Sequence, residues 1–487
     1  MRSETHSDLP MEFWTLNPSD LAVAVIDART GNEWTYGQLA EDSARMQAAL
    51  PQSGRRTLGV LMAQNRYECF VAYLAALNSG SALMLLDAAV NPSLIGELLQ
   101  VYQPDWIYTS PLQPEFPGYR NAASGEPGLL EIEKPRDIDI YPDLALLLST
   151  SGSTGSPKLV RLTLRNLQAN ADSITRYLQL TSHDRPITSL PMSYSYGLSV
   201  INSHLNAGAA IVLTESGVLQ REFWGAVDRY SCTSFAGVPY TYQLLLKTGL
   251  LKTVGSSLKL LTQAGGLLEE RYARQMHSLS LRRDWKFFVM YGQTEASPRI
   301  SYVPCEQLGR KFGSIGIAVP DGSLTTDPQT GELIYTGPNV MLGYAESRRD
   351  LARGDELHGV LRTGDLARQD AEGYFFITGR AKRFIKLFGK RFNLDDVETI
   401  LSRRFELSVA CYGRDDLLTV AVEQGGNPEA LGVAICKIFG LPRTSVQVVA
   451  MKALPRTSNG KLDYQSMTVS DVARPKALTG QQETKTR

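Results

Sequence analysis

The stretch from Ser149 to Lys158 reads STSGSTGSPK and directly follows the apolar residues 146–148. Glycines allow backbone N–H groups to converge on an anion, hydroxyl groups add donors, and Lys158 adds a positive charge. This composition predicts an anion-binding loop, although an ordinary polar hairpin loop has a similar composition. The spacing differs from that of a Walker loop, because Pro157 precedes the lysine and no Ser or Thr follows it.

Four later segments gather glycine, acidic and basic residues in short polar motifs. They read MYGQTEAS (290–297), RTGDL (362–366), GRAKRFIKLFGKRFNLDDVE (379–398) and LPRTSNGKLD (454–463). Taken singly, these motifs also fit a strand–loop connection, a common turn or a surface lysine. In this order after the loop, they resemble the adenylate-forming superfamily over roughly residues 20–465. That superfamily contains acyl- and aryl-CoA synthetases, adenylation domains of peptide synthetases and firefly luciferase.

The resemblance implies a reaction in which a carboxylate attacks the α-phosphate of ATP and pyrophosphate leaves. ATP and Mg²⁺ are the implied cofactors, and the protein contributes positioning and charge neutralisation rather than a covalent nucleophile. Glu295 is the implied Mg²⁺ ligand, because this ion prefers hard oxygen ligands. Thr294 is implied at the α-phosphate, Tyr291 against the adenine, and Asp365 at both ribose hydroxyl groups. The implied ATP-binding set is Thr150, Ser151, Gly152, Ser153, Thr154, Gly155, Lys158, Tyr291, Gly292, Gln293, Asp365 and Arg380.

Lys461 is the implied catalytic lysine, acting together with Thr294 and Glu295. A flexible loop can carry its ammonium group to the attacking carboxylate and the α-phosphate. The family usually has Ser-Gly-Lys at this point, whereas this chain has Asn459 before the glycine, and Leu159 replaces the glycine that usually follows the loop lysine. We expect neither difference to touch the chemistry.

Lys382 resembles the hinge about which the small domain of the family rotates after adenylation. The resemblance implies that the other face of this domain then shapes a tunnel for a thiol, lined by Lys386, Phe388 and Gly389. A basic, solvent-exposed edge strand is the other interpretation of the same stretch. Both interpretations are compatible, because a carrier protein or the phosphates of CoA would favour basic residues.

The segment LPMSYSYGLS (190–199) resembles the beginning of the acid pocket. Amino-acid-activating members carry an aspartate there, and this segment has no acidic residue. An α-amino acid is therefore disfavoured, because a buried ammonium group without a partner is costly. The expected pocket residues, which also fit ordinary core packing, are Tyr194, Tyr196, Gly237, Tyr240, Gly265 and Gly266. We expect the three glycines to leave space for a flat or extended acyl chain.

Short apolar, strand-like runs at residues 57–87, 259–265 and 285–292 alternate with helical segments, which predicts an α/β body with parallel-rich sheets. After about residue 313 short β segments predict a β-rich subdomain, and the chain beyond Arg380 predicts a small, mobile α+β domain. The expected domains are an adenylation core at 1–380, a C-terminal domain at 381–468 and a disordered tail at 469–487.

Overall composition narrows the range of partners and locations. Lys plus Arg and Asp plus Glu both number 50, so the net charge is zero and gives no support for a nucleic-acid partner. No apolar run approaches the ~18–20 residues that span a bilayer, and the N-terminus lacks the order of a signal peptide. The five cysteines form no C-x-x-C pair, which favours a reducing, cytoplasmic location.

Three functions remain open at this point. The first is a ligase that activates a small carboxylic acid and transfers the acyl group to CoA or to the phosphopantetheine of a separate carrier protein. The second is a stand-alone amino-acid adenylation enzyme that loads such a carrier. The third is a nucleotide-binding regulatory protein without catalysis, which the presence of Lys461 and Glu295 disfavours.

Overall fold

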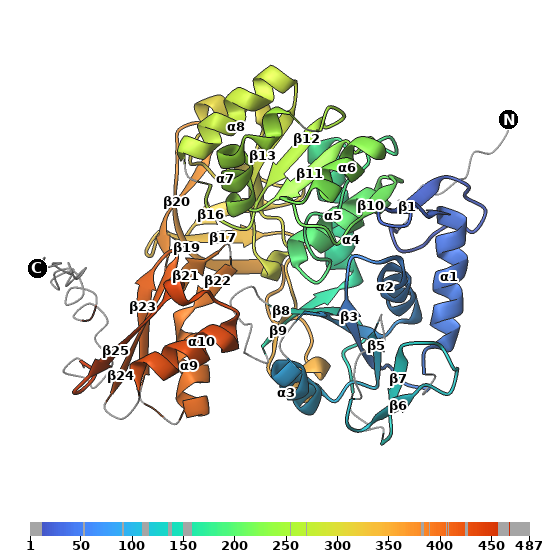
Figure 1. Ribbon diagram of the computed structural model, residues 1–487, viewed down its shortest axis with the longest axis horizontal. Coiled ribbons are helices and arrows are strands. Elements are labelled where there is room, and N and C mark those ends of the chain that lie inside the picture. Colours follow the sequence, from blue (N-terminus) through green and yellow to red (C-terminus); the bar gives the residue numbers. More distant parts are fainter. Residues whose placement is uncertain are drawn as a thin grey trace, which may run out of the picture. The chain divides into compact units, whose positions relative to one another are not determined.

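The computed structural model describes residues 12–51, 54–89, 92–109, 116–134, 139–149, 158–253, 255–268, 270–380, 384–388, 390–405, 407, 409–423, 427–455 and 467. The chain divides into two compact units, residues 1–382 and 383–487 (Figure 1). Across the described residues, every helix is too short or too polar to cross a membrane.

The largest sheet of the first unit has eight strands in the order β18-β9-β8-β4-β3-β5-β7-β6. The strands are β3 (Leu58–Ala63), β4 (Ala82–Asp87), β5 (Trp106–Thr109), β6 (Tyr119–Asn121), β7 (Leu129–Ile132), β8 (Leu144–Ser149), β9 (Leu159–Thr163) and β18 (Gly343–Ala345). The central strands β8, β4, β3 and β5 are parallel, as the sequence predicts. The outer pairs are antiparallel, and the pair β8 and β9 is joined by the predicted anion-binding loop.

Helices cover both faces of this sheet. They are α1 (Tyr36–Ala49), α2 (Tyr67–Ser79) and α3 (Pro92–Tyr102). Along β3, Leu61 belongs to the core that contains α2, whereas its neighbour Val60 belongs to the core that contains α3. This alternation follows from the opposite directions of successive side chains in a strand. Helix α2 ends at Gly80, which adopts a positive φ of 72°, a conformation that favours glycine at the end of a helix.

A second sheet has the order β11-β12-β13-β14-β15, with β11, β12 and β13 parallel and the last two strands antiparallel. Its strands are β11 (Ser234–Gly237), β12 (Leu260–Gln263), β13 (Lys286–Tyr291), β14 (Ser301–Val303) and β15 (Ile317–Ala318). Helices α6 (Arg221–Arg229), α7 (Pro239–Thr248) and α8 (Glu270–Arg283) accompany it. A smaller sheet, in the order β10-β1-β2, consists of β1 (Val23–Asp27), β2 (Glu33–Thr35) and β10 (Ile211–Leu213).

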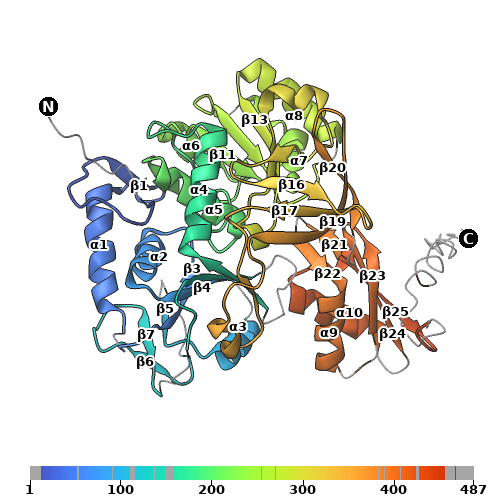
Figure 2. The ribbon, with the colours of Figure 1, turned by 180° about the vertical axis from the view of Figure 1, so that it is seen from behind.

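Two helices lie between the large sheets, namely α4 (Leu164–Leu178) and α5 (Ser195–Asn206) (Figure 2). Leu198 and Ile201 of α5 pack into the core of the eight-stranded sheet, while Tyr196 packs with Leu260 and Phe288 of the second sheet. Because α5 is packed on both sides, its first residues are held in a fixed position relative to both sheets.

The β-rich part of the first unit is a four-stranded antiparallel sheet in the order β16-β17-β19-β20. The strands are β16 (Ser323–Thr326), β17 (Glu332–Thr336), β19 (Val360–Gln369) and β20 (Phe375–Arg380). Asp365 lies on β19, and its Cα partner on β20 is Arg380. Short 3-10 helices are η1 (Leu250–Lys252), η2 (Thr294–Ala296), η3 (Cys305–Arg310), η4 (Arg348–Ala352) and, in the second unit, η5 (Arg443–Ser445).

The second unit is an α+β structure with a core of its own, in which Ile385, Val397, Val420 and Ile435 pack together. It contains a hairpin of β21 (Phe384–Leu387) and β22 (Lys390–Asn393) and a sheet of β23 (Val409–Arg414), β24 (Leu417–Glu423) and β25 (Val446–Met451). Its helices are α9 (Leu394–Phe405) and α10 (Pro428–Phe439). The tail predicted at 469–487 lies outside the described residues.

Gly59 on β3 tests the packing of the central sheet. A Cβ at this position would lie 2.0 Å from the Trp106 ring, so Gly59→Ala forces the indole out of its place. We expect a loss of about 1–3 kcal/mol in stability, seen as a lower thermal midpoint. The matched control is Gly96→Ala on α3, where a Cβ meets nothing within 4 Å. That change should stabilise the helix by about 0.5–1 kcal/mol, and an unchanged midpoint for Gly59→Ala would contradict the packing described here.

Candidate functional site

Tyr291 and Gln293 meet Asp365 through hydrogen bonds. The Tyr291 hydroxyl donates to Asp365 Oδ2 at 2.6 Å, and Gln293 Nε2 donates to the same oxygen at 3.2 Å. Gln293 Nε2 also donates to the Thr363 carbonyl at 2.8 Å. The structure therefore brings together two segments that the sequence predicts at the adenine and at the ribose. A buried carboxylate oriented by two donors is suited to accept hydroxyl groups.

The chain between Tyr291 and Arg299 turns back on itself. A Cβ on Gly292 would lie 1.6 Å from the Pro298 carbonyl oxygen, so this position requires glycine. The Ile300 amide donates to the Tyr291 carbonyl at 3.0 Å, which closes the turn. Inside the turn, η2 places Thr294 and Glu295 on different sides.

Glu295 is held by a tyrosine that sequence reasoning did not identify. The Tyr344 hydroxyl donates to Glu295 Oε1 at 2.8 Å, and the Lys158 ammonium lies 4.0 Å from the centre of the Tyr344 ring. Lys158 also lies 3.9 Å from a carboxylate oxygen of Glu346. The structure thus joins the end of the predicted phosphate loop to the predicted magnesium ligand. The Gly-Tyr pair after the strand GELIYT is the only sequence feature that marks Tyr344, and it is not distinctive.

The described residues contain no group of three or more His, Cys, Asp or Glu placed to hold a metal. Mg²⁺ is commonly bound by one or two carboxylates together with water and substrate phosphates. Glu295, fixed by Tyr344 and close to Lys158, therefore fits a Mg²⁺ that is held mainly by a nucleotide.

Thr294 connects the nucleotide segment to the predicted acid pocket. Its Oγ1 lies 3.0 Å from Oγ of Ser195, the first residue of α5. The next residue, Tyr196, is buried, and its hydroxyl donates to the Thr262 carbonyl at 2.9 Å. Tyr196 is therefore anchored to β12 at the predicted pocket, and its hydroxyl is already hydrogen-bonded to Thr262.

The predicted pocket glycines contact neighbouring side chains closely. A Cβ on Gly265 would lie 2.6 Å from the Tyr194 hydroxyl, and one on Gly237 would lie 2.9 Å from the Tyr242 ring. The space beside these two glycines is thus taken by aromatic residues in this structure. Gly265 also has a φ of 82°, which favours glycine. Gly266 accepts a hydrogen bond from Gln263 Nε2 at 3.0 Å, and Tyr240 is 49% exposed.

In the second unit, Lys386 and Phe388 lie on the hairpin of β21 and β22. Their backbone N–H groups donate to the carboxylates of Asp415 and Asp416, at 2.8 Å and 3.1 Å. Phe388 is exposed and has a positive φ of 51°. The remaining predicted residues lie outside the described part: Thr150, Ser151, Gly152, Ser153, Thr154, Gly155, Lys382, Gly389, Lys461 and the side chain of Arg380.

Known proteins resemble this chain in sequence and in fold. A sequence model described as AMP-binding enzyme matches residues 15–345. The chain is 28% identical over 474 residues to an indoleacetate–CoA ligase from Aromatoleum aromaticum, covering 88% of this chain and 91% of that one. It is 26% identical over 386 residues to a 2-succinylbenzoate–CoA ligase from Bacillus pumilus, covering 76% and 77%. A solved double mutant of o-succinylbenzoate CoA synthetase from Bacillus subtilis has the same fold, with a TM-score of 0.74 at 22% identity over 92% and 96% of the chains.

Tyr344→Phe tests the link between the phosphate loop and Glu295. The change removes the hydroxyl that donates to Glu295 Oε1 and keeps the ring beneath Lys158. We expect a 3- to 10-fold rise, on the order of 1 kcal/mol, in the Mg²⁺ concentration that gives half-maximal ATP-dependent pyrophosphate release. Tyr102→Phe is the control, because it also removes a tyrosine hydroxyl close to this segment, but one that donates to the backbone carbonyl of Ala345. An equal Mg²⁺ requirement in both variants would show that Tyr344 does not position Glu295.

Proposed function

The chain belongs to the AMP-binding enzyme family, and we propose that this AMP-forming acid–thiol ligase activates a small carboxylic acid with ATP and transfers the acyl group to CoA. The observation that carries the proposal is the double connection of the nucleotide segment. Tyr291 and Gln293 bind Asp365 on one side, and Thr294 meets Ser195 of the acid pocket on the other. A carboxylate and a nucleotide bound to this segment therefore lie next to each other, as acyl-adenylate formation requires.

Each group of the first unit contributes positioning or charge in this reaction. Asp365 accepts the ribose hydroxyl groups, and Tyr291 supports that carboxylate from the adenine side. Lys158 brings a positive charge to the phosphates, while Thr294 donates its hydroxyl at the α-phosphate. When bound at Glu295, Mg²⁺ neutralises charge on the phosphates. Lys461 supplies an ammonium group that bridges the attacking carboxylate and the α-phosphate, which lowers the repulsion between two anions.

The names of the relatives support CoA as the acceptor. The two curated relatives described above are CoA ligases that act on indoleacetate and 2-succinylbenzoate. Transfer to a separate carrier protein is the alternative, and an amino-acid substrate is disfavoured because Ser195 stands in a segment without an acidic residue.

We further propose that residues 381–468 rotate about Lys382 between the two half-reactions. The five cysteines, all free, agree with the proposed cytoplasmic location.

Pyrophosphate release tests the acceptor directly. Purified protein is incubated with MgATP and a panel of aryl, fatty, hydroxy and amino acids, each with and without CoA. We expect release that depends on a non-amino acid and is accelerated by CoA, because acyl transfer frees the site for the next cycle. Pyrophosphate release at the same rate with and without CoA would favour a carrier protein as the acyl acceptor. Release with amino acids alone would contradict the assignment of the acid pocket.

Lys461→Ala tests the assigned catalytic lysine. We expect acyl-adenylate formation to fall by at least about 1,000-fold, the scale of a preorganised charge in a transition state, while ATP binding measured by calorimetry is retained. Lys452→Ala, a change of an exposed lysine just after β25, is the matched control and should leave the rate unchanged. Adenylation at the wild-type rate in Lys461→Ala would remove this residue from the mechanism.

A further inference from the structure

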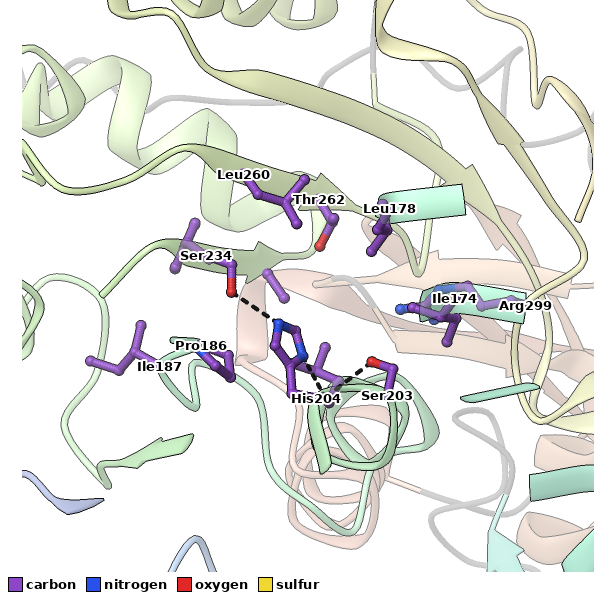
Figure 3. A pocket seen from close by; sticks show the side chains of 13 residues that line it. Ile174, Leu178, Pro186, Ile187, Ser203, His204, Ser234, Leu260, Thr262 and Arg299 are labelled. Carbon is purple, nitrogen blue, oxygen red and sulfur yellow. Dashed lines mark hydrogen bonds between the residues drawn. The ribbon is translucent and has the colours of Figure 1, made fainter. Parts of the chain in front are cut away.

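A small cavity lies between helices α4 and α5 and strands β11 and β12 (Figure 3). Its volume is about 20 Å³, enough for about one water-sized group. Burial lowers the pKa of His204 to about 4, so this lining side chain is neutral at pH 7. Among the described lining residues, Arg299 is consequently the only side chain that is charged at neutral pH. Figure 3 shows Arg299 entering the cavity from the side opposite Pro186 and Ile187.

Arg299 differs from two other deeply buried arginines of the first unit. Arg161 pairs with Glu356 at 2.7 Å, and Arg348 pairs with Asp105 at 3.1 Å. Arg299 is 2% exposed, and no carboxylate within the described ranges forms an ion pair with it. Its Nε has no hydrogen-bond partner, and its guanidinium group lies 4.2 Å from the centre of the Tyr196 ring. A buried charge without a counter-charge is costly, which points to a partner other than the carboxylates of the described residues.

The position of Arg299 is fixed by the surrounding backbone. Its amide donates to Asn170 Oδ1 of α4 at 3.2 Å, and its carbonyl accepts from Asn339 Nδ2 at 2.7 Å. These two hydrogen bonds fix the backbone of Arg299, from which its side chain enters the cavity. A preorganised donor fork of this kind matches the geometry of a carboxylate or sulfonate.

The guanidinium group also borders the predicted acid pocket. Burial raises the pKa of the Tyr177, Tyr194 and Tyr196 phenols, and the charge of Arg299 opposes this shift in all three. Tyr194 and Tyr196 flank Ser195, which meets the nucleotide segment at Thr294. Arg299 thus contacts the ring of the residue that follows Ser195, so a group of the acid that extends beyond Ser195 would approach its guanidinium group.

We propose that Arg299 binds a second anionic group of the acid, so that the substrate class is a carboxylic acid with a further carboxylate or sulfonate. This inference rests on the proposed function, because it concerns the same acid pocket. The cavity has room for about one water-sized group, so it fits one oxygen of the distal anion facing the guanidinium group and not a bulky substituent. Binding places an anion against a buried charge that no carboxylate of the described ranges pairs with.

Wild-type selectivity is the first measurement. Acid-dependent pyrophosphate release is measured with succinate, glutarate, homophthalate and 3-sulfopropionate, and with the monoamide of each dicarboxylate. We expect kcat/KM for at least one diacid to exceed that of its monoamide by about 100-fold or more, because a buried charged donor rejects a neutral analogue. The sulfonate arm shows whether the site accepts anions other than carboxylate. Monoamides used as well as every diacid would overturn the inference and leave the proposed function intact, whereas no release with any acid would overturn both.

Two variants then locate the selectivity. Arg299→Met should lower kcat/KM for the preferred diacid by about 100-fold and change that of its monoamide by less than about threefold, and Arg299→Lys should lie between. Arg348→Met is the control, because it removes another buried arginine while Asp105 keeps Arg55 at 2.7 Å. That control should lower the thermal midpoint without changing the ratio of diacid to monoamide. Equal losses on both substrates in Arg299→Met would make Arg299 structural and overturn the inference.

Discussion

The turn formed by residues 291–299 is the constraint on which the candidate site depends. Gly292 and the Pro298 carbonyl approach each other so closely that no side chain fits between them. With both ends of the turn held together, successive side chains point to different neighbours. Tyr291 contacts Asp365, Thr294 contacts Ser195 and Glu295 contacts Tyr344. One short segment thereby connects the β-rich sheet, the central helices and the end of the phosphate loop.

The residues that contact this turn are held in place by the two large sheets. Helix α5 is packed against both, so Ser195 is fixed before any ligand binds. Tyr344 lies on β18, which pairs with β9 next to Lys158. Positions set by rigid elements are more accurate than positions set by loops, and polar groups that hold one another cost little reorganisation during a reaction. The same packing buries Arg299 beside the ring of Tyr196, and no carboxylate of the described residues forms an ion pair with it.

Much of this arrangement is predictable from sequence because local signals are strong. The strand and helix at residues 57–87 follow hydrophobic periodicity, and Gly80 ends its helix as a glycine should. The family, the fold class and the ligase activity likewise follow from motifs that lie in a fixed order. The antiparallel edges of the large sheets were not predicted, because short strands such as β6 and β7 carry little periodicity of their own.

Tertiary contacts account for what the sequence does not reveal at the site. Tyr344 follows Glu295 by 49 residues, and nothing in its local sequence signals that their side chains meet. Arg299 follows the motif MYGQTEAS as an ordinary polar residue in the sequence, and its burial depends on segments such as α4 that pack against it. Gly237 and Gly265 predict room for an acyl chain in the acid pocket. The size of that pocket, however, depends on the aromatic side chains of Tyr242 and Tyr194, which approach these glycines.

The division of the chain gives the proposed reaction a physical order. The residues that we propose to orient the acid and the nucleotide belong to residues 1–382, whereas Lys461, the proposed catalytic lysine, belongs to residues 383–487. In the proposed reaction, substrate binding depends on contacts within the first unit, and the Lys461 ammonium group adds its charge separately. Because the desolvation of an ammonium group is offset only when two anions are present, its entry is favoured after both substrates are bound. A charge delivered in this way stabilises the transition state more than it stabilises either substrate alone.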